Sequence, residues 1–378
     1  MHKAVVAEIR VLMTVEAAWH HVPGGTARVA LDLASALDER PDIQVQGLAA
    51  MHRKKALGDW RPSINVSHHR LPRLLLYESW SRSQWPKAKC SNSADLIHST
   101  TIITPPASSI PLVVNVHDLA FRKFPDRFPK RARLLFERSW KRVLERADAV
   151  LSPSKATSDD LRAGGLDRGK LHLIPLGHNP IEVSEIVQAS TSQKFGIGER
   201  FILAAGTLEP RKNVPSLLKA FEKIVHETES QLVLAGPIGW GVSLSQLLGS
   251  VSKATQDKVI VTGAVSREEL AALYFRATAF CYPSLLEGFG LPVLEAMSYG
   301  TAVVTSKDRS TEEVAGVAAL TVDPLSVDEI AEALKLVLTD ASVAKELGDL
   351  GRKRAKLFTW EAAAASTVDV YRSLLWPM

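Results

Sequence analysis

The most informative stretch of this chain is Pro283-Ser-Leu-Leu-Glu-Gly-Phe-Gly-Leu-Pro-Val-Leu-Glu-Ala-Met297. It follows the apolar run 279–282, so it predicts a strand end, a glycine-rich loop and a helix start, with Pro292 suited to the first helical turn. Gly288 and Gly290 let the backbone approach a ligand closely, and the free N–H groups of a helix start favour a diphosphate. The stretch therefore predicts a phosphate-binding loop.

Two carboxylates flank this loop, Glu287 within it and Glu295 in the expected helix. A helix rises about 1.5 Å per residue, so Glu295 lies roughly 6 Å beyond the helix start and the two acids can lie on opposite sides of a diphosphate. Carboxylates accept hydrogen bonds from vicinal hydroxyls and stabilise positive charge at an anomeric carbon. The pair is predicted to contact a sugar and a ribose, and the alternative is a surface loop with two solvated acids.

Outward from this stretch, strand-length apolar runs alternate with amphipathic helical stretches along the whole chain. The expected strands lie at 10–15, 43–48, 95–98, 112–116, 149–152 and 171–175, and again at 201–205, 231–235, 258–262, 279–282, 302–305 and 319–322. This α/β alternation predicts parallel sheets covered by helices, in which ligands bind beyond the carboxyl ends of the strands.

The chain of 378 residues is long enough for two cores, and the polar stretch 182–199 is interpreted as a linker between them. We therefore expect two doubly wound, Rossmann-like domains, 1–181 and 200–358, that face each other across a cleft. A C-terminal helix is expected within 359–378, packed on one of the two domains, with the N-terminal domain as a candidate.

Composition narrows the class of protein. No apolar run is long enough to span a membrane and the N-terminus lacks the features of a secretory signal, so a cytoplasmic protein is expected. The two cysteines, Cys90 and Cys281, have no metal-ligand spacing. Neither a disulfide framework nor a bound metal is therefore expected.

Three further sites follow strands. Arg211 and Lys212 lie in a turn after the strand 201–205, where two cations would neutralise a diphosphate leaving group unless they are simply solvated. His117 ends the strand 112–116, either as a functional imidazole or as a buried structural one. Gly25 lies in a glycine loop that is not Gly-x-Gly-x-x-Gly, which argues against a dinucleotide-dependent dehydrogenase; a plain tight turn is the alternative.

The string from Glu287 to Glu295 resembles the Glu-x7-Glu signature of retaining GT-B glycosyltransferases of family 4 (group 1), and the resemblance extends over 24–372. It implies a catalytic Glu287 that contacts the donor hexose, and Glu295 on the ribose. The remaining donor-binding residues that it implies are Gly25, Arg211, Lys212, Val265, Gly288, Phe289, Gly290 and Leu291. It also implies that His117, from the other domain, lies near the reacting sugar as a second catalytic residue.

Strings 207–213 and 117–120 are most similar to those of bacterial mannosyltransferases of polysaccharide assembly. The resemblance implies transfer of mannose from GDP-mannose to a glycan or lipid-linked acceptor, without a metal or other cofactor. Two alternatives stay open. One is a nucleotide-sugar epimerase on a similar two-domain scaffold, and the other is a scaffold that binds nucleotide sugar without turnover.

The segment 122–146 carries ten Lys or Arg against three acids, while the rest of the chain has a net charge of about −2. Its aromatic neighbours are Phe121, Phe124, Phe128, Phe136 and Trp140. Cations beside aromatic residues suit an anionic membrane surface, so we expect peripheral contact with the inner face of the membrane. The alternative is a solvated helix whose apolar side packs on its own domain. Nucleic acid is not an expected partner, because no binding motif accompanies the cations.

Overall fold

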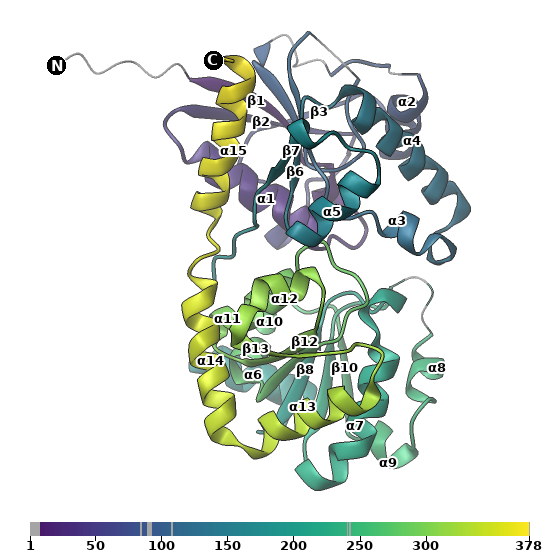
Figure 1. Cartoon of the computed structure of the whole chain (residues 1–378), viewed down its shortest axis with the longest axis vertical. Helices are drawn as coiled ribbons and strands as arrows, with labels where there is room; N and C mark the ends of the chain where they lie inside the picture. The colour runs from purple at the N-terminus through teal and green to yellow at the C-terminus, as the bar shows by residue number, and fades with distance from the viewer. Residues whose placement is uncertain are drawn as a thin grey trace, which may run out of the picture. The chain divides into compact units, whose positions relative to one another are not determined.

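The computed structural model describes residues 8–83, 85–88, 93–106, 109–239, 241 and 243–377. Contacts divide the chain into two units, Met1–Gly177 with Thr359–Met378, and His178–Phe358. Each unit is a parallel sheet covered by helices (Figure 1). The α/β class with two doubly wound, Rossmann-like domains is therefore confirmed.

The first unit contains a seven-stranded sheet of order β3-β2-β1-β4-β5-β6-β7, in which neighbouring strands pair in parallel. Its strands are β1 (Ile9–Thr14), β2 (Ile43–Ala49), β3 (Val66–His68), β4 (Leu96–Ser99), β5 (Leu112–Asn115), β6 (Ala149–Ser152) and β7 (Leu171–Leu173). The order reverses between β1 and β4, the place where such sheets bind ligands beyond the carboxyl ends of their strands. Only β3 was not expected, because three residues at a sheet edge make too short a run to recognise.

The helices of the first unit are η1 (Glu16–Trp19), α1 (Gly25–Asp38), η2 (Gly58–Trp60), α2 (Arg73–Arg82), α3 (Ala120–Lys123), η4 (Pro125–Arg127), α4 (Lys130–Arg146), α5 (Lys155–Ala163), η5 (Arg168–Lys170) and α15 (Trp360–Leu375). Helix α15, the last of the chain, packs against α1 (Figure 1). Gly177 lies directly against the start of α15. A Cβ at this position would be only 2.2 Å from the backbone nitrogen of Trp360, so only glycine fits. The C-terminal helix thus belongs to the first unit.

A buried histidine ties α15 to the sheet of this unit. The Nδ1 atom of His98 lies 2.6 Å from the hydroxyl of Tyr371, and its Nε2 atom lies 2.7 Å from Oδ1 of Asn115. The amide oxygen can only accept, so Nε2 carries the proton and Nδ1 accepts from the tyrosine. Burial lowers the pKa of His98 to about 4, which keeps the imidazole neutral at physiological pH.

We therefore expect this histidine to make the protein sensitive to mild acid. An unfolded chain binds a proton on His98 near pH 6.5, and the folded chain does so only near pH 4. Stability from this group is complete above about pH 6.5 and falls by about 3 kcal/mol as the pH drops through that window. Urea unfolding at several pH values should show a smaller loss for His98→Gln than for the wild type. Equal pH profiles would contradict this role.

The second unit contains a six-stranded sheet of order β10-β9-β8-β11-β12-β13, again with parallel pairs. Its strands are β8 (Phe201–Ala205), β9 (Gln231–Ala235), β10 (Val259–Gly263), β11 (Ala279–Tyr282), β12 (Ala302–Ser306) and β13 (Ala319–Val322). Its helices are α6 (Glu185–Phe195), η6 (Pro210–Lys212), α7 (Val214–Thr228), α8 (Leu244–Leu248), α9 (Lys253–Gln256), α10 (Arg267–Arg276), α11 (Leu291–Tyr299), α12 (Ser310–Ala315), η7 (Gly316–Ala318), α13 (Val327–Thr339) and α14 (Ala341–Ala355). Strands β8 and β11 are neighbours at the reversal of the order, so their carboxyl ends meet.

The segment interpreted as a linker, 182–199, differs from expectation because it contains helix α6 and belongs to the second unit. The Ser184 hydroxyl caps the start of this helix, and Gly196 ends it in the left-handed conformation with φ 66°. The helix packs on α10, and an ion pair of 2.5 Å joins Lys194 to Glu269. Only Thr191 is buried along it, so its polar sequence lacks the apolar stripe by which helices are recognised.

Candidate active site

The predicted phosphate-binding loop has the expected local structure. Strand β11 ends at Tyr282, and helix α11 begins at Leu291 with Pro292 in its first turn. Gly290 caps the helix at φ 110°, and a Cβ there would lie 2.9 Å from Cγ2 of Thr311. Both the positive φ and the close approach require glycine at this position.

The structure brings Glu287, Arg211 and Lys212 into one cluster. The Oε2 atom of Glu287 accepts a hydrogen bond from Nη1 of Arg211 at 2.8 Å, and its Oε1 atom accepts from Nζ of Lys212 at 2.7 Å. Two further hydroxyls donate to Oε1, from Ser284 at 2.6 Å and from Tyr282 at 3.1 Å. The predicted sugar-binding carboxylate and the predicted diphosphate-binding cations are therefore direct partners.

Two loops are joined so that this cluster forms. The turn η6 carries Arg211 and Lys212 beyond β8, and the residue after it, Asn213, is left-handed at φ 58°. The carbonyl oxygen of Arg211 accepts a hydrogen bond from the backbone N–H of Leu285 at 2.8 Å, and the hydroxyl oxygen of Ser284 lies 3.0 Å from the same carbonyl. The cations are thus held by the backbone against the loop that carries the carboxylate.

Burial makes the charges of the cluster strongly coupled. The side chains of Glu287 and Lys212 are only 9% and 11% exposed. Burial raises the pKa of Glu287, but the charges of Arg211 and Lys212 outweigh it and bring that pKa down to about 2. Burial and the neighbouring guanidinium lower the pKa of Lys212, against the attraction of Glu287. Arg211 is shared with Glu209, which accepts from its Nε at 2.7 Å, so two cations balance two carboxylates.

The second carboxylate, Glu295, lies on α11 and is held by a tyrosine that the sequence did not indicate. The Tyr274 hydroxyl donates to Oε2 of Glu295 at 2.8 Å. Tyr274 is buried on α10, and its ring stacks on that of Tyr299 with centroids 6.1 Å apart. No pattern could have identified Tyr274, whereas Tyr282 and Ser284 stand at a strand end, the position where ligand-binding side chains gather.

The remaining predicted donor residues of this unit have varied surroundings. Gly288 is buried in the loop, and Leu291 is half-buried at the start of α11. The side chain of Phe289 is buried and its ring lies 5.8 Å from that of Phe358, so it serves in packing. Val265 is half-buried between β10 and α10, at the carboxyl end of its strand.

Two predicted residues, His117 and Gly25, belong to the first unit. His117 follows β5, its Nε2–H donates to the carbonyl of Thr100 at 3.0 Å, and burial lowers its pKa. Gly25 is the first residue of α1, and a Cβ at this position would meet no atom within 4 Å. Packing within the first unit therefore does not require glycine at position 25.

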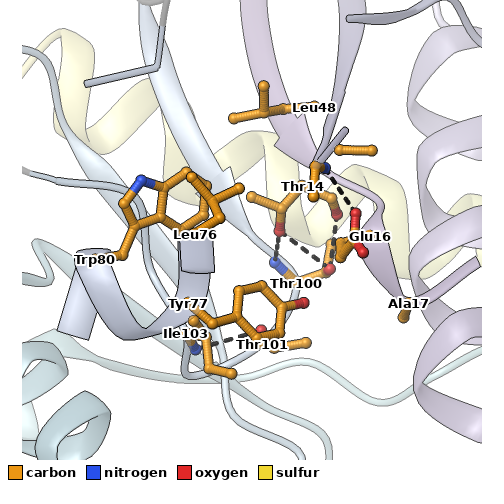
Figure 2. Close-up of a pocket in the computed structure, with 12 residues that line it drawn as sticks. Thr14, Glu16, Ala17, Leu48, Leu76, Tyr77, Trp80, Thr100, Thr101 and Ile103 are labelled. Atoms are coloured by element: carbon orange, nitrogen blue, oxygen red, sulfur yellow. Dashed lines mark hydrogen bonds between the residues drawn. The ribbon is translucent and has the colours of Figure 1, made fainter. Parts of the chain in front are cut away.

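A small pocket of about 10 Å³ lies at the carboxyl ends of β1, β2 and β4 (Figure 2). Glu16, which the sequence did not indicate, is buried beside it and accepts from the backbone N–H of Ala50 at 2.7 Å and from Nε2 of His52 at 2.9 Å. The hydroxyls of Thr14 and Thr100 lie 3.3 Å apart. Room for about one water molecule remains among these groups, so they serve to join the strand ends.

The aromatic residues near the cationic segment 122–146, which were expected to face a membrane, are mostly packed inside the first unit. Phe121 and Trp140 are buried in the core of the first unit. Phe136 packs on Phe121 and Phe128, with ring centroids 5.6 and 6.2 Å apart. Helix α4 is amphipathic, and its two aromatic residues, Phe136 and Trp140, lie on the side that packs on the core. The rings of Phe121, Phe128, Phe136 and Trp140 therefore give no support to membrane contact.

Among the described residues, no three His, Cys, Asp or Glu side chains form a group that could hold a metal ion. No helix in the described ranges is both long and apolar enough to cross a bilayer. Cys90 lies outside the described residues, and Cys281 is buried as a free thiol in β11.

Comparison with known proteins identifies the family. Residues 23–181 match the family described as Glycosyltransferase Family 4, and residues 188–354 match Glycosyl transferases group 1. O-antigen chain mannosyltransferase B of Escherichia coli is 33% identical over 69% of this chain and 70% of that protein. The MMP alpha-(1->4)-mannosyltransferase of Mycolicibacterium hassiacum is 32% identical over 62% of this chain and 56% of that protein.

Solved structures share the fold at lower identity. A sucrose-phosphate synthase of Thermosynechococcus elongatus superposes with a TM-score of 0.77 at 23% identity, covering 97% of this chain and 99% of that one. Anabaena Alr3699/HepE in complex with UDP-glucose has a TM-score of 0.75 at 17% identity, covering 97% and 100%. Fold and site thus define a protein of the GT-B architecture. The chain belongs to the glycosyltransferases of family 4, group 1, and is a glycosyltransferase, as the sequence predicted.

Proposed function

We propose that this protein is a retaining hexosyltransferase that moves mannose from GDP-mannose to a glycan or lipid-linked acceptor in polysaccharide assembly. The observation that carries the proposal is the buried cluster of Glu287, Arg211 and Lys212 at the joined ends of β8 and β11. It combines a carboxylate for sugar hydroxyls with two cations for a leaving diphosphate. Retention of configuration rests on the resemblance of the 287–295 string.

The cluster suggests how a donor would bind. A diphosphate at the loop offers oxygen acceptors that compete with Glu287 for the N–H groups of Arg211 and Lys212. As these bonds are exchanged, the carboxylate of Glu287 becomes available to hydroxyls of the hexose. In this proposal the charge that grows on the departing diphosphate is stabilised by cations already held in place by the backbone of the two loops.

The mannose donor is proposed from the relatives. Both curated relatives described above carry the name mannosyltransferase, and another relative is named O-antigen chain mannosyltransferase RfbU, from Salmonella typhimurium. RfbU is 31% identical over 57% of this chain and 59% of that protein. These names support mannose as the sugar and a surface polysaccharide as the product. The preference for guanine as the base of the donor is tested by the binding experiment that follows.

The test is a calorimetric and mass-spectrometric screen of GDP-mannose, UDP-glucose and UDP-N-acetylglucosamine against the wild type, Glu295→Ala and Lys212→Ala. We expect GDP-mannose to bind and both substitutions to weaken it. Two exposed residues of the same unit provide matched controls, Glu332→Ala on α13 and Lys219→Ala on α7. These controls should bind like the wild type.

Product analysis separates the alternatives. Transfer of the sugar to an added or co-purified acceptor supports the proposal, whereas an isomerised donor or free sugar without any need for an acceptor would indicate an epimerase. Donor binding without transfer or hydrolysis would indicate a scaffold. Binding that ignores both Glu295→Ala and Lys212→Ala would overturn the proposed site.

We expect Tyr274→Phe to weaken donor binding about tenfold, because Glu295 loses the hydroxyl that orients it towards the ribose. Tyr299→Phe is the control, since its ring also stacks on Tyr274 but its hydroxyl bonds to the backbone of Ile181. Titration calorimetry with GDP-mannose measures both. A Tyr274→Phe protein with wild-type affinity would show that donor binding does not depend on this hydroxyl.

Transfer is expected to continue in the presence of a chelator. Arg211 and Lys212 supply two positive charges at the proposed position of the diphosphate, which is the task that a divalent cation performs in metal-dependent transferases. Initial rates with EDTA and with added Mg²⁺ should agree within about twofold. Loss of activity in EDTA, restored by Mg²⁺, would refute the metal-independent part of the proposal.

A further inference from the structure

Helices α2 and α4 of the first unit pack side by side and enclose a groove on their outer face. Leu75, Ser79 and Arg82 line it from α2, and Lys130, Leu134 and Arg138 line it from α4. The groove is distinct from the pocket at the strand ends shown in Figure 2. Its lining therefore combines two leucines with several cationic side chains.

Leucines of both helices are exposed to solvent here. Leu74 and Leu75 are each 60% exposed and Leu134 is 47% exposed, while Leu76 and Trp80 of the same α2 helix are buried in the core. The α2 helix thus shows apolar residues on both sides. Leucines grouped in this way mark a surface that contacts something apolar.

An exposed tryptophan adjoins the same groove. The carbonyl oxygen of Trp85 accepts a hydrogen bond from the hydroxyl of Ser79, which lines the groove. The Trp85 side chain itself is 66% exposed. Tryptophan is enriched at the level of lipid headgroups, where one end of its ring can be apolar and the other wet.

The charges at this face are strongly unbalanced. Helices α2 and α4 together carry nine Lys or Arg and three Glu. The one acid of the groove, Glu78, is neutralised several times over, by Nη2 of Arg138 at 2.8 Å, Nε of Arg82 at 3.0 Å and Nε of Arg131 at 3.6 Å. Three guanidiniums share one carboxylate, so the groove offers unsatisfied positive charge to phosphate groups.

We propose that the α2–α4 face docks on the surface of an anionic phospholipid bilayer, with Leu74, Leu75 and Leu134 entering the headgroup region. The cations are attracted to the anionic lipids, and burial of the leucines among the headgroups adds to the binding free energy. This inference goes beyond the proposed transfer reaction. It would bring the enzyme to acceptors that are anchored in lipid.

The test is sedimentation of the full chain with vesicles, without donor or acceptor. Vesicles of phosphatidylcholine mixed equally with phosphatidylglycerol should bind about tenfold more protein than pure phosphatidylcholine, and about 0.5 M salt should weaken that binding. We expect Leu75→Ser with Leu134→Ser, and separately Lys130→Glu with Arg131→Glu, each to reduce binding about tenfold.

Matched controls lie in the second unit. Leu325 and Leu357 are 72% and 70% exposed, so Leu325→Ser with Leu357→Ser removes as much exposed leucine. Lys253→Glu with Lys345→Glu reverses two exposed lysines that, like Arg131, have a carboxylate neighbour. Both control proteins should bind vesicles like the wild type.

Other outcomes would overturn the docking proposal. Binding that is equal on neutral and anionic vesicles, or that the groove substitutions leave unchanged, would exclude this face as the docking surface. Sedimentation velocity without lipid provides a second check. A dimer that Leu75→Ser with Leu134→Ser dissociates would show that the leucines are covered by a second copy of the chain. Donor binding by the groove variants should stay at the wild-type level in every case.

Discussion

Replacing Lys212 with alanine is expected to lower the rate of sugar transfer about 10²- to 10³-fold, with a smaller effect on donor affinity. The Lys212 side chain is 11% exposed, and its ammonium group is held between Glu287 and the hydroxyl of Tyr282. In the proposed reaction its charge matters most when the bond to the diphosphate breaks, since negative charge on the departing group is then greatest. Interactions that strengthen in the transition state act on kcat more than on KM.

Steady-state kinetics with the donor identified by the screen measures this effect. Lys219→Ala removes a lysine from the exposed side of α7, close to the site in sequence, and should leave kcat unchanged. The opposite pattern, a raised KM with unchanged kcat for Lys212→Ala, would assign Lys212 to ground-state binding. In that case leaving-group stabilisation would have to come from Arg211.

The second large effect is expected for Glu287→Gln, which should lower transfer about 10²- to 10³-fold and also destabilise the second unit by about 3 kcal/mol. The amide is similar in shape, but it removes the charge that compensates Arg211 and Lys212 at 2.8 and 2.7 Å. Arg211 would then keep its contact with Glu209, but Lys212 would lose its carboxylate contact. Urea unfolding and transfer kinetics together measure both losses.

The same carboxylate gives the wild type a recognisable acid dependence. The pKa of Glu287 is about 2 in the folded protein against 4.5 ordinarily, so its stabilising charge is complete above about pH 4.5 and is lost as the pH falls towards 2. The stability of Glu287→Gln should fall less across that window. If Glu287→Gln loses as much stability as the wild type across this pH range, Glu287 is not the group that titrates.

A double-mutant cycle measures how much of the stability depends on Lys212 and Glu287 acting as a pair. If Lys212 and Glu287 act as one unit, Lys212→Ala combined with Glu287→Gln should cost much less stability than the two single changes added together. Additive losses would mean that the 2.7 Å contact contributes little to folding.

Sequence patterns located most strands of the two sheets because many of them are buried on both faces and appear as continuous apolar runs. The strands expected at 201–205, 231–235, 279–282 and 319–322 have those bounds in the structure. The glycine loop and the helix after it could be predicted for a similar reason, since turn chemistry depends on neighbouring residues. Gly290 and Pro292 each perform their role within a few residues of chain.

Helix α6 and the aromatic rings near α4 show where local patterns fail. Helix α6 buries only Thr191, so its position depends on contact with α10 and on caps at its two ends. The rings of Phe121 and Phe136 could face lipid or the protein core, and the sequence supports both. Packing in the first unit decides for the core.

Local spacing and strand ends were enough to predict the fold class, the family and four candidate site residues, Glu287, Glu295, Arg211 and Lys212. The partners of these residues could not be predicted, because they come from distant parts of the chain. Lys212 meets Glu287 from 75 positions away, and Tyr274 meets Glu295 from 21 positions away. Leu75 likewise joins the cations of α4 only through helix packing. Such pairs form where separate elements are brought together by burial of the core, and no local periodicity records them.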